Sequence, residues 1–108
     1  MGDHTVSTYH IEICIAGNLD DAKRTCRSFC FNVGLCVTVT PTDYVYTGGQ
    51  EAGVIVRLIN YPRFPTTKEQ MWEVAVALGA RLKHDLCQNN YSLVADDKTQ
   101  WFEGAKNG

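Results

Sequence analysis

An acidic side chain and a basic side chain would face each other if two of the predicted strands pair. His10 and Glu12 lie on one face of a strand predicted over residues 9–16, and Arg57 lies in a strand predicted over 53–60. Glu12 opposite Arg57 would form a cross-strand ion pair, in which Arg57 could hold an anionic ligand or contact a partner. The alternatives are a surface ion pair worth about 0–1 kcal/mol and a dimer interface. The pairing depends on the strand register.

Cysteine chemistry is the second possibility, because the chain contains five cysteines: Cys14, Cys26, Cys30, Cys36 and Cys87. Their neighbours are mostly apolar, so we interpret them as reduced core thiols of a cytoplasmic protein. The pairs His84 with Cys87 and Cys26 with Cys30 could each supply half of a zinc site. Cys-x-x-Cys knuckles are absent, so we expect no metal and no cofactor. A Cys14 nucleophile activated by His10 is disfavoured, since four residues of strand span about 13 Å.

Aromatic and arginine side chains, which are common at binding hot spots, gather in two predicted loops. The candidate contact residues are Tyr44 and Tyr46 beside a Gly-Gly turn, and Tyr61, Arg63 and Phe64 around two prolines. In the alternative interpretation, Tyr61 and Phe64 only pack against the sheet edge and the start of the next helix.

The composition narrows the class of protein. The chain has 108 residues, 44% hydrophobic and 20% charged, with a net charge of −2. This favours one domain over residues 1–108, with an ordered core at about 7–103. The mild acidity and the lack of a basic-aromatic motif argue against nucleic-acid binding. We expect no membrane contact, because the start has no apolar signal region and the longest weakly polar run, 74–80, is too short to span a bilayer.

Hydrophobic periodicity predicts the elements that must position these side chains. Asn18 is a candidate N-cap and Gly34 a candidate C-terminal residue of the first helix, while Thr66 and Glu69 form a candidate capping box for the second. The expected elements, in chain order, are a strand over 9–16, a helix over 19–33, a strand over 35–40 that meets Pro41 and can continue over 42–47, a strand over 53–60, a helix from about 67 to 88, a strand over 91–95, and a return strand or packed tail over 100–103.

This order, βαββαβ, predicts an α+β fold of the ferredoxin-like type. We expect an antiparallel sheet with its first and third strands in the middle and two helices on one face. The other face, with His10, Glu12 and Arg57, would then be free for a ligand or a partner. The fold hosts many unrelated functions, so it implies no chemistry by itself.

Three segments together resemble small uncharacterised proteins encoded by tailed bacteriophages: Tyr9–Ile13, Val33–Val39 and Leu58–Pro65. The resemblance covers most of the chain and carries no catalytic residue with it. It implies a phage accessory protein that works in the host cytoplasm. Such proteins often block a host enzyme or defence system, or sequester a small signal molecule.

The sequence shows no complete catalytic constellation. We therefore expect a small non-enzymatic cytoplasmic binding protein, a homodimer that binds a host protein or defence component. The alternative is a small-molecule binder or small enzyme that uses the helix-free face of the sheet, with His10, Glu12 and Arg57 as its polar groups.

Overall fold

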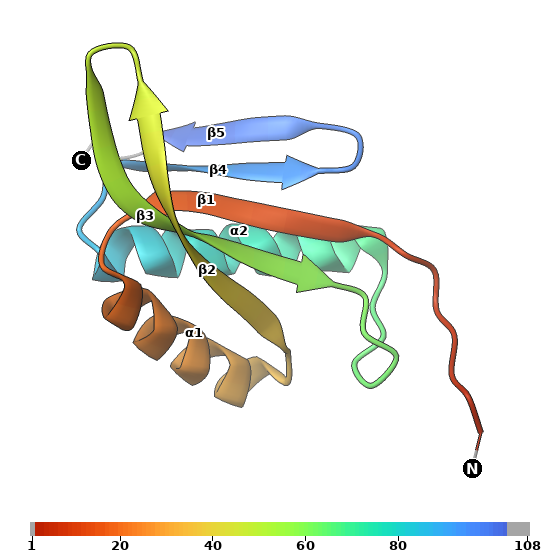
Figure 1. Ribbon diagram of the computed structural model, residues 1–108. Helices are drawn as coiled ribbons and strands as arrows, with labels where there is room; N and C mark the ends of the chain where they lie inside the picture. The colour runs from red at the N-terminus through yellow and green to blue at the C-terminus, as the bar shows by residue number, and fades with distance from the viewer. Residues whose placement is uncertain (1, 104–108) are drawn as a thin grey trace.

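Strand β1 (His10–Ala16) lies at the centre of a five-stranded antiparallel sheet with the order β2-β3-β1-β4-β5 (Figure 1). The computed structural model describes residues 2–103. The other elements are α1 (Leu19–Val33), β2 (Val37–Tyr46), β3 (Gly49–Ile59), α2 (Lys68–Asp85), β4 (Asn90–Ala95) and β5 (Thr99–Glu103). Both helices pack on one face of the sheet, and the β2–β3 hairpin projects beyond them (Figure 1).

The predicted α+β class, the antiparallel sheet and the two helices on one face are confirmed. The ferredoxin-like βαββαβ topology is not confirmed, because the sheet has five strands in the order β2-β3-β1-β4-β5. β5 pairs with β4 through a register that places Phe102 beside Tyr91, and so adds a fifth strand at one edge. The two rings stack at a centroid distance of 4.7 Å, which gives the short strand an apolar contact as well as its ladder.

Local capping chemistry defines both helices. The Asn18 side chain accepts a hydrogen bond from the Asp21 N–H at the start of α1, and Gly34, with φ of 77°, ends it. Only glycine adopts that backbone conformation without steric cost, so both predicted ends of α1 are confirmed. The capping box predicted for α2 is wrong by one residue, because Thr67 rather than Thr66 is the N-cap and its partner is Gln70.

The core lies between the sheet and the helices, where alternate residues of β1 meet the apolar stripes of α1 and α2. Ile13 is fully buried, with Ile11 and Ile15 nearly so, whereas the residues between them face the helix-free side. The remaining core is largely aliphatic and includes Ala22, Cys26, Val54, Val56, Leu58, Met71, Ala75, Leu78, Leu82, Leu86, Tyr91 and Leu93. The period-two pattern therefore assigned the two faces of β1 correctly.

Pro41 lies within β2, which runs through it without a break. β2 pairs only with β3, so one edge of it has no ladder partner in the described residues, and a residue without an N–H is tolerated there. β2 therefore lies at the edge of the sheet, and the continuation predicted over 42–47 is part of the same strand as far as Tyr46.

Among the described residues, no helix is both long enough and apolar enough to cross a membrane. The single-domain boundaries, the cytoplasmic location and the homodimer stay predictions. Residues 104–108, at the C-terminal side of the expected ordered core, lie outside the described residues.

Candidate functional site

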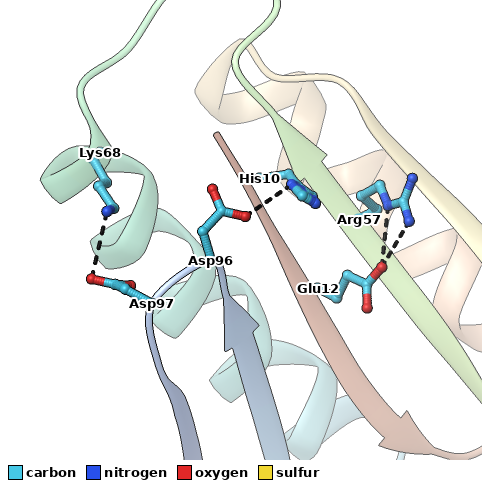
Figure 2. A network of polar contacts seen from close by, with 6 residues as sticks. All are labelled: His10, Glu12, Arg57, Lys68, Asp96 and Asp97. Carbon is cyan, nitrogen blue, oxygen red and sulfur yellow. Dashed lines mark hydrogen bonds and ion pairs between the residues drawn. The ribbon is translucent and has the colours of Figure 1, made fainter. Parts of the chain in front are cut away.

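The predicted ion pair forms at the middle of the helix-free face. The register of β1 and β3 places Glu12 directly opposite Arg57. The Arg57 Nη2 and Nε atoms donate to one oxygen of Glu12 at 2.8 and 3.3 Å (Figure 2). The Arg57 side chain is half exposed, so water screens this interaction. The ligand-binding role of the pair stays a prediction.

His10 lies at the start of β1, where a second polar contact connects it to the turn between β4 and β5. Its Nδ1 is 3.4 Å from Oδ1 of Asp96, and both side chains are partly exposed (Figure 2). The next residue of that turn, Asp97, lies 3.5 Å from Nζ of Lys68 at the start of α2 (Figure 2). Two consecutive aspartates thus hold the turn against two different elements.

Between these elements lies a cavity of about 350 Å³, which we call the β1–α2 cavity. It combines an indole ring with carboxylates and amines from three parts of the chain. Its lining consists of Tyr9, His10 and Ile11 from β1 and the segment before it, Lys68, Glu69, Trp72 and Glu73 from α2, and Ala95, Asp96, Asp97 and Lys98 from β4 and its turn.

The first turns of α2 supply much of this chemistry, because residues four apart lie on the same face of a helix. Lys68 and Trp72 are one such pair, and Glu69 and Glu73 are another. From the opposite side, the Lys98 Nζ lies 4.1 Å from the centroid of the Trp72 ring. Lys98 is exposed, so its long side chain borders the cavity from the solvent side.

Of the cavity residues, the sequence had suggested only His10. The apolar stripe of the second helix drew attention to its buried face, whereas Trp72 and Glu73 lie to the side of that stripe. The sequence favours a turn role for Asp96 and Asp97, because an aspartate side chain accepts hydrogen bonds from its own backbone there. The sequence signal that could have indicated this cavity is Trp72, which lies between Glu69 and Glu73 and four residues after Lys68.

Tyr44 shares the helix-free face but packs as part of the sheet. It lies in β2 rather than in a loop, and its Oη donates to the Val54 carbonyl at 2.6 Å. Its ring covers Gly53, where a Cβ would come within 2.6 Å of the ring. Burial raises the pKa of Tyr44 and that of the neighbouring Cys14 thiol. Both groups therefore stay protonated at neutral pH.

Tyr46 lies at the tip of the β2–β3 hairpin, away from Tyr44. Its side chain is exposed, and its Oη donates to Glu51 at 3.3 Å. Desolvation is slight there, and the negative charge of Glu51 is the main cause that raises the pKa of Tyr46. The two tyrosines that the sequence grouped together thus belong to different environments.

The loop after β3 borders a second, more apolar cavity of about 710 Å³ between the C-terminal part of α1 and α2. Tyr61 and Phe64 line it, together with Phe29 and Met71. Arg63 lies with its guanidinium carbon 5.6 Å from the Phe64 ring centroid. The eight sequence candidates therefore occupy three separate places: the helix-free face with its edge at His10, the hairpin tip and this loop.

No family model and no curated protein matches the sequence. Two solved structures share the fold. One is a phage SAM lyase in complex with S-methyl-5'-thioadenosine, with a TM-score of 0.74 and 17% identity over 96% of this chain and 95% of that chain. The other is a phage SAM lyase in the apo state, with a TM-score of 0.68 and 18% identity over 89% of each chain.

These neighbours correct the function expected from the sequence. The main expectation, a non-enzymatic protein that binds a host component, is contradicted because the shared fold is that of a phage enzyme. The neighbour's small-molecule ligand supports the alternative, a small-molecule binder or small enzyme. The expected resemblance to phage proteins agrees with both neighbours, whereas the protein partner and the homodimer gain no support from them.

Proposed function

We propose that this chain binds S-adenosylmethionine (SAM) and cleaves it, releasing S-methyl-5'-thioadenosine. The observation that carries the proposal is the β1–α2 cavity, in which an aromatic ring and several carboxylates surround a space of about 350 Å³. The fold shared with a SAM lyase that holds this thioadenosine adds support. Together with the resemblance to tailed-phage proteins, it also supports a phage origin for the chain.

The chemistry of the cavity suits the ligand. Ligand pockets typically measure roughly 300–1,000 Å³, so the cavity is large enough for a compact nucleoside. SAM carries a sulfonium cation, an ammonium group, a carboxylate and a flat purine. The Trp72 ring can contact the purine or the sulfonium, Glu69 and Asp96 can hold the ammonium, and Lys68 can hold the carboxylate.

Release of the thioadenosine requires one bond to break. The bond between sulfur and the γ-carbon of the amino-acid arm cleaves, and its electron pair goes to sulfur, so the sulfonium becomes a neutral thioether. In the same step, the four-carbon fragment either forms a lactone, as its own carboxylate oxygen bonds to the γ-carbon, or loses a β-proton to a base and becomes an alkene. Both routes balance without a further reactant.

The residues of the cavity fit these routes in different ways. The positive charge on sulfur disappears during the reaction. Water stabilises the charged reactant more than the less charged transition state, so a site that excludes water from the ligand lowers the barrier. For lactone formation, the protein need only fold the amino-acid arm back on itself. For proton removal, His10 is the candidate base, and the Asp96 carboxylate 3.4 Å away orients its ring.

The experiment is incubation of the purified chain with SAM and chromatography of the thioadenosine released. Proton NMR of the four-carbon product separates the lactone from the alkene. Trp72→Leu should lower the rate of release by at least about tenfold, whereas the matched control Trp101→Leu alters an exposed tryptophan on β5. Release no faster than the spontaneous decay of SAM would overturn the proposal. Equal loss in both variants would place the site elsewhere.

A further inference from the structure

The Trp72 ring already holds a cation. The Lys98 Nζ lies 4.1 Å from the ring centroid, within the range of about 6 Å in which ammonium groups are attracted to the ring face. The two residues come from different elements: Trp72 is half-buried on α2, and Lys98 is exposed on the turn after β4. The ring is therefore the fixed partner and the lysine the movable one.

The charges around the ring favour a cation there. Four carboxylates line the cavity, those of Glu69, Glu73, Asp96 and Asp97, against the two amines of Lys68 and Lys98. Lys68 pairs with Asp97, and His10 with Asp96. An aromatic face surrounded by excess negative charge attracts a positive group and gains little from a neutral one.

We infer that the face of Trp72 is the seat of the ligand's sulfonium, and that the Lys98 ammonium occupies this seat until the ligand displaces it. The inference rests on the proposed function and adds the means by which the site recognises charge. It also explains release: once sulfur is neutral, the thioadenosine no longer competes with Lys98, and the lysine returns to the ring.

The inference predicts a difference between charged and neutral ligands that calorimetry can measure on the whole chain. Sinefungin carries an ammonium group where SAM has its sulfonium, and S-adenosylhomocysteine is the neutral thioether. Lys98→Ala should tighten sinefungin binding by about three- to tenfold and leave S-adenosylhomocysteine within about twofold. Trp72→Leu should remove most of the preference for sinefungin over the thioether.

Lys68→Ala is the matched control, because it deletes the same charge from the same cavity but leaves the Lys98 ammonium over the ring. It should change the ratio of the two affinities by less than half as much as Lys98→Ala. Equal effects of the two lysine variants would mean that only net charge matters, and would overturn the inference. Circular dichroism confirms that the variants are folded.

A titration with trimethylsulfonium separates failure of this inference from failure of the proposed function, since this small cation has no adenosine. The indole N–H signal of Trp72 should shift, and should shift further at the same concentration in Lys98→Ala. If neither nucleoside binds but this shift is seen, the proposed function fails and the cation seat remains. If the nucleosides bind but the Trp72 signal does not move, the cation seat is overturned.

Discussion

The Arg57 guanidinium donates two hydrogen bonds to a single oxygen, Oε2 of Glu12, across the central strands β1 and β3. The pair lies on the helix-free face, next to the His10–Asp96 contact at the edge of the β1–α2 cavity (Figure 2). Its geometry is good, but 51% of the Arg57 side chain and 27% of the Glu12 side chain are exposed. Screening therefore limits its contribution to stability.

Arg57→Ala is expected to lower the free energy of unfolding by only about 0–1 kcal/mol. Glu12→Gln should behave alike, and the double variant in a urea-denaturation cycle gives the coupling energy. Arg57→Ala also tests the ligand-binding role predicted for Arg57. If its affinity for sinefungin is unchanged, Arg57 is not part of the ligand site. A loss of stability above about 2 kcal/mol would show that the pair is not screened as an exposed pair is.

Gly79→Ala should destabilise the protein by about 1–3 kcal/mol. A Cβ at this position in α2 would lie 2.2 Å from Cε2 of Tyr91. The ring cannot move away easily, because it stacks on Phe102 and its Oη donates to the Val76 carbonyl at 3.1 Å. Overpacking should thus outweigh the roughly 1 kcal/mol that alanine normally contributes over glycine in a helix.

The control for this prediction is the same substitution in a Tyr91→Ala background. Without the ring, Gly79→Ala should become stabilising, since only the helix propensity remains. Thermal unfolding of the four proteins measures the change. A Gly79→Ala variant that is more stable than the wild-type chain would contradict the close contact.

The stability of the chain should fall in acid partly through Asp85, which links the two helices. Thr25 Oγ1 donates to Asp85 Oδ2 at 2.7 Å, and Arg81 Nε approaches the same oxygen at 3.2 Å. The Thr25 hydrogen bond, followed by the His84 contact, holds the pKa of Asp85 below its ordinary value of 3.8. A depressed folded-state pKa means that the stabilisation is complete above the unfolded value and is lost as pH falls through the folded one.

Thr25→Val should therefore lower the free energy of unfolding by about 0.5–1.5 kcal/mol at neutral pH. The difference from the wild-type chain should shrink below about pH 4, where Asp85 becomes protonated in the unfolded and then in the folded chain. Asp85→Asn should flatten the same part of the profile. Urea denaturation at a series of pH values checks this, and a gap that stays constant into acid would contradict it.

The five thiols should react with iodoacetamide in the order of their exposure. Cys36 and Cys87 are exposed, whereas burial raises the pKa of Cys26 to about 12. Since the thiolate is the reactive form, Cys26 should stay unmodified in the folded chain at about pH 8. Mass spectrometry after peptide digestion identifies the modified sites, with labelling in urea as the control. Modification of Cys26 as fast as that of Cys87 would contradict the buried position.

The sequence determined the parts of the fold that obey local rules. The alternation of β1, the Asn18 cap and the Gly34 end of α1 follow from side-chain period and backbone sterics within a few residues. The capping box of α2 shows where such rules stop. Thr66 with Glu69 and Thr67 with Gln70 fit the same pattern.

Tertiary contacts decide between these two caps. The Tyr9 hydroxyl donates to the Thr66 carbonyl, and the Thr66 N–H donates to the Asn60 side chain at 2.9 Å. These contacts tie Thr66 to the segments that flank β1 and β3, which leaves the adjacent Thr67 to cap the helix. Sequence spacing cannot reveal this, because Tyr9 lies just before β1 and Asn60 just after β3, and only the pairing of these strands brings both to Thr66.

The candidate site, like the helix caps, was predictable from the sequence only in part. The sequence alone established the residue types of the Glu12–Arg57 pair, and the register then joined them. It could not assemble the β1–α2 cavity, because Trp72 and Lys98 are 26 positions apart and meet only when β4 returns beside β1. The periodicity of apolar residues predicts which face of a helix or strand is buried. A cavity depends instead on which separate helices and strands pack side by side in the folded chain.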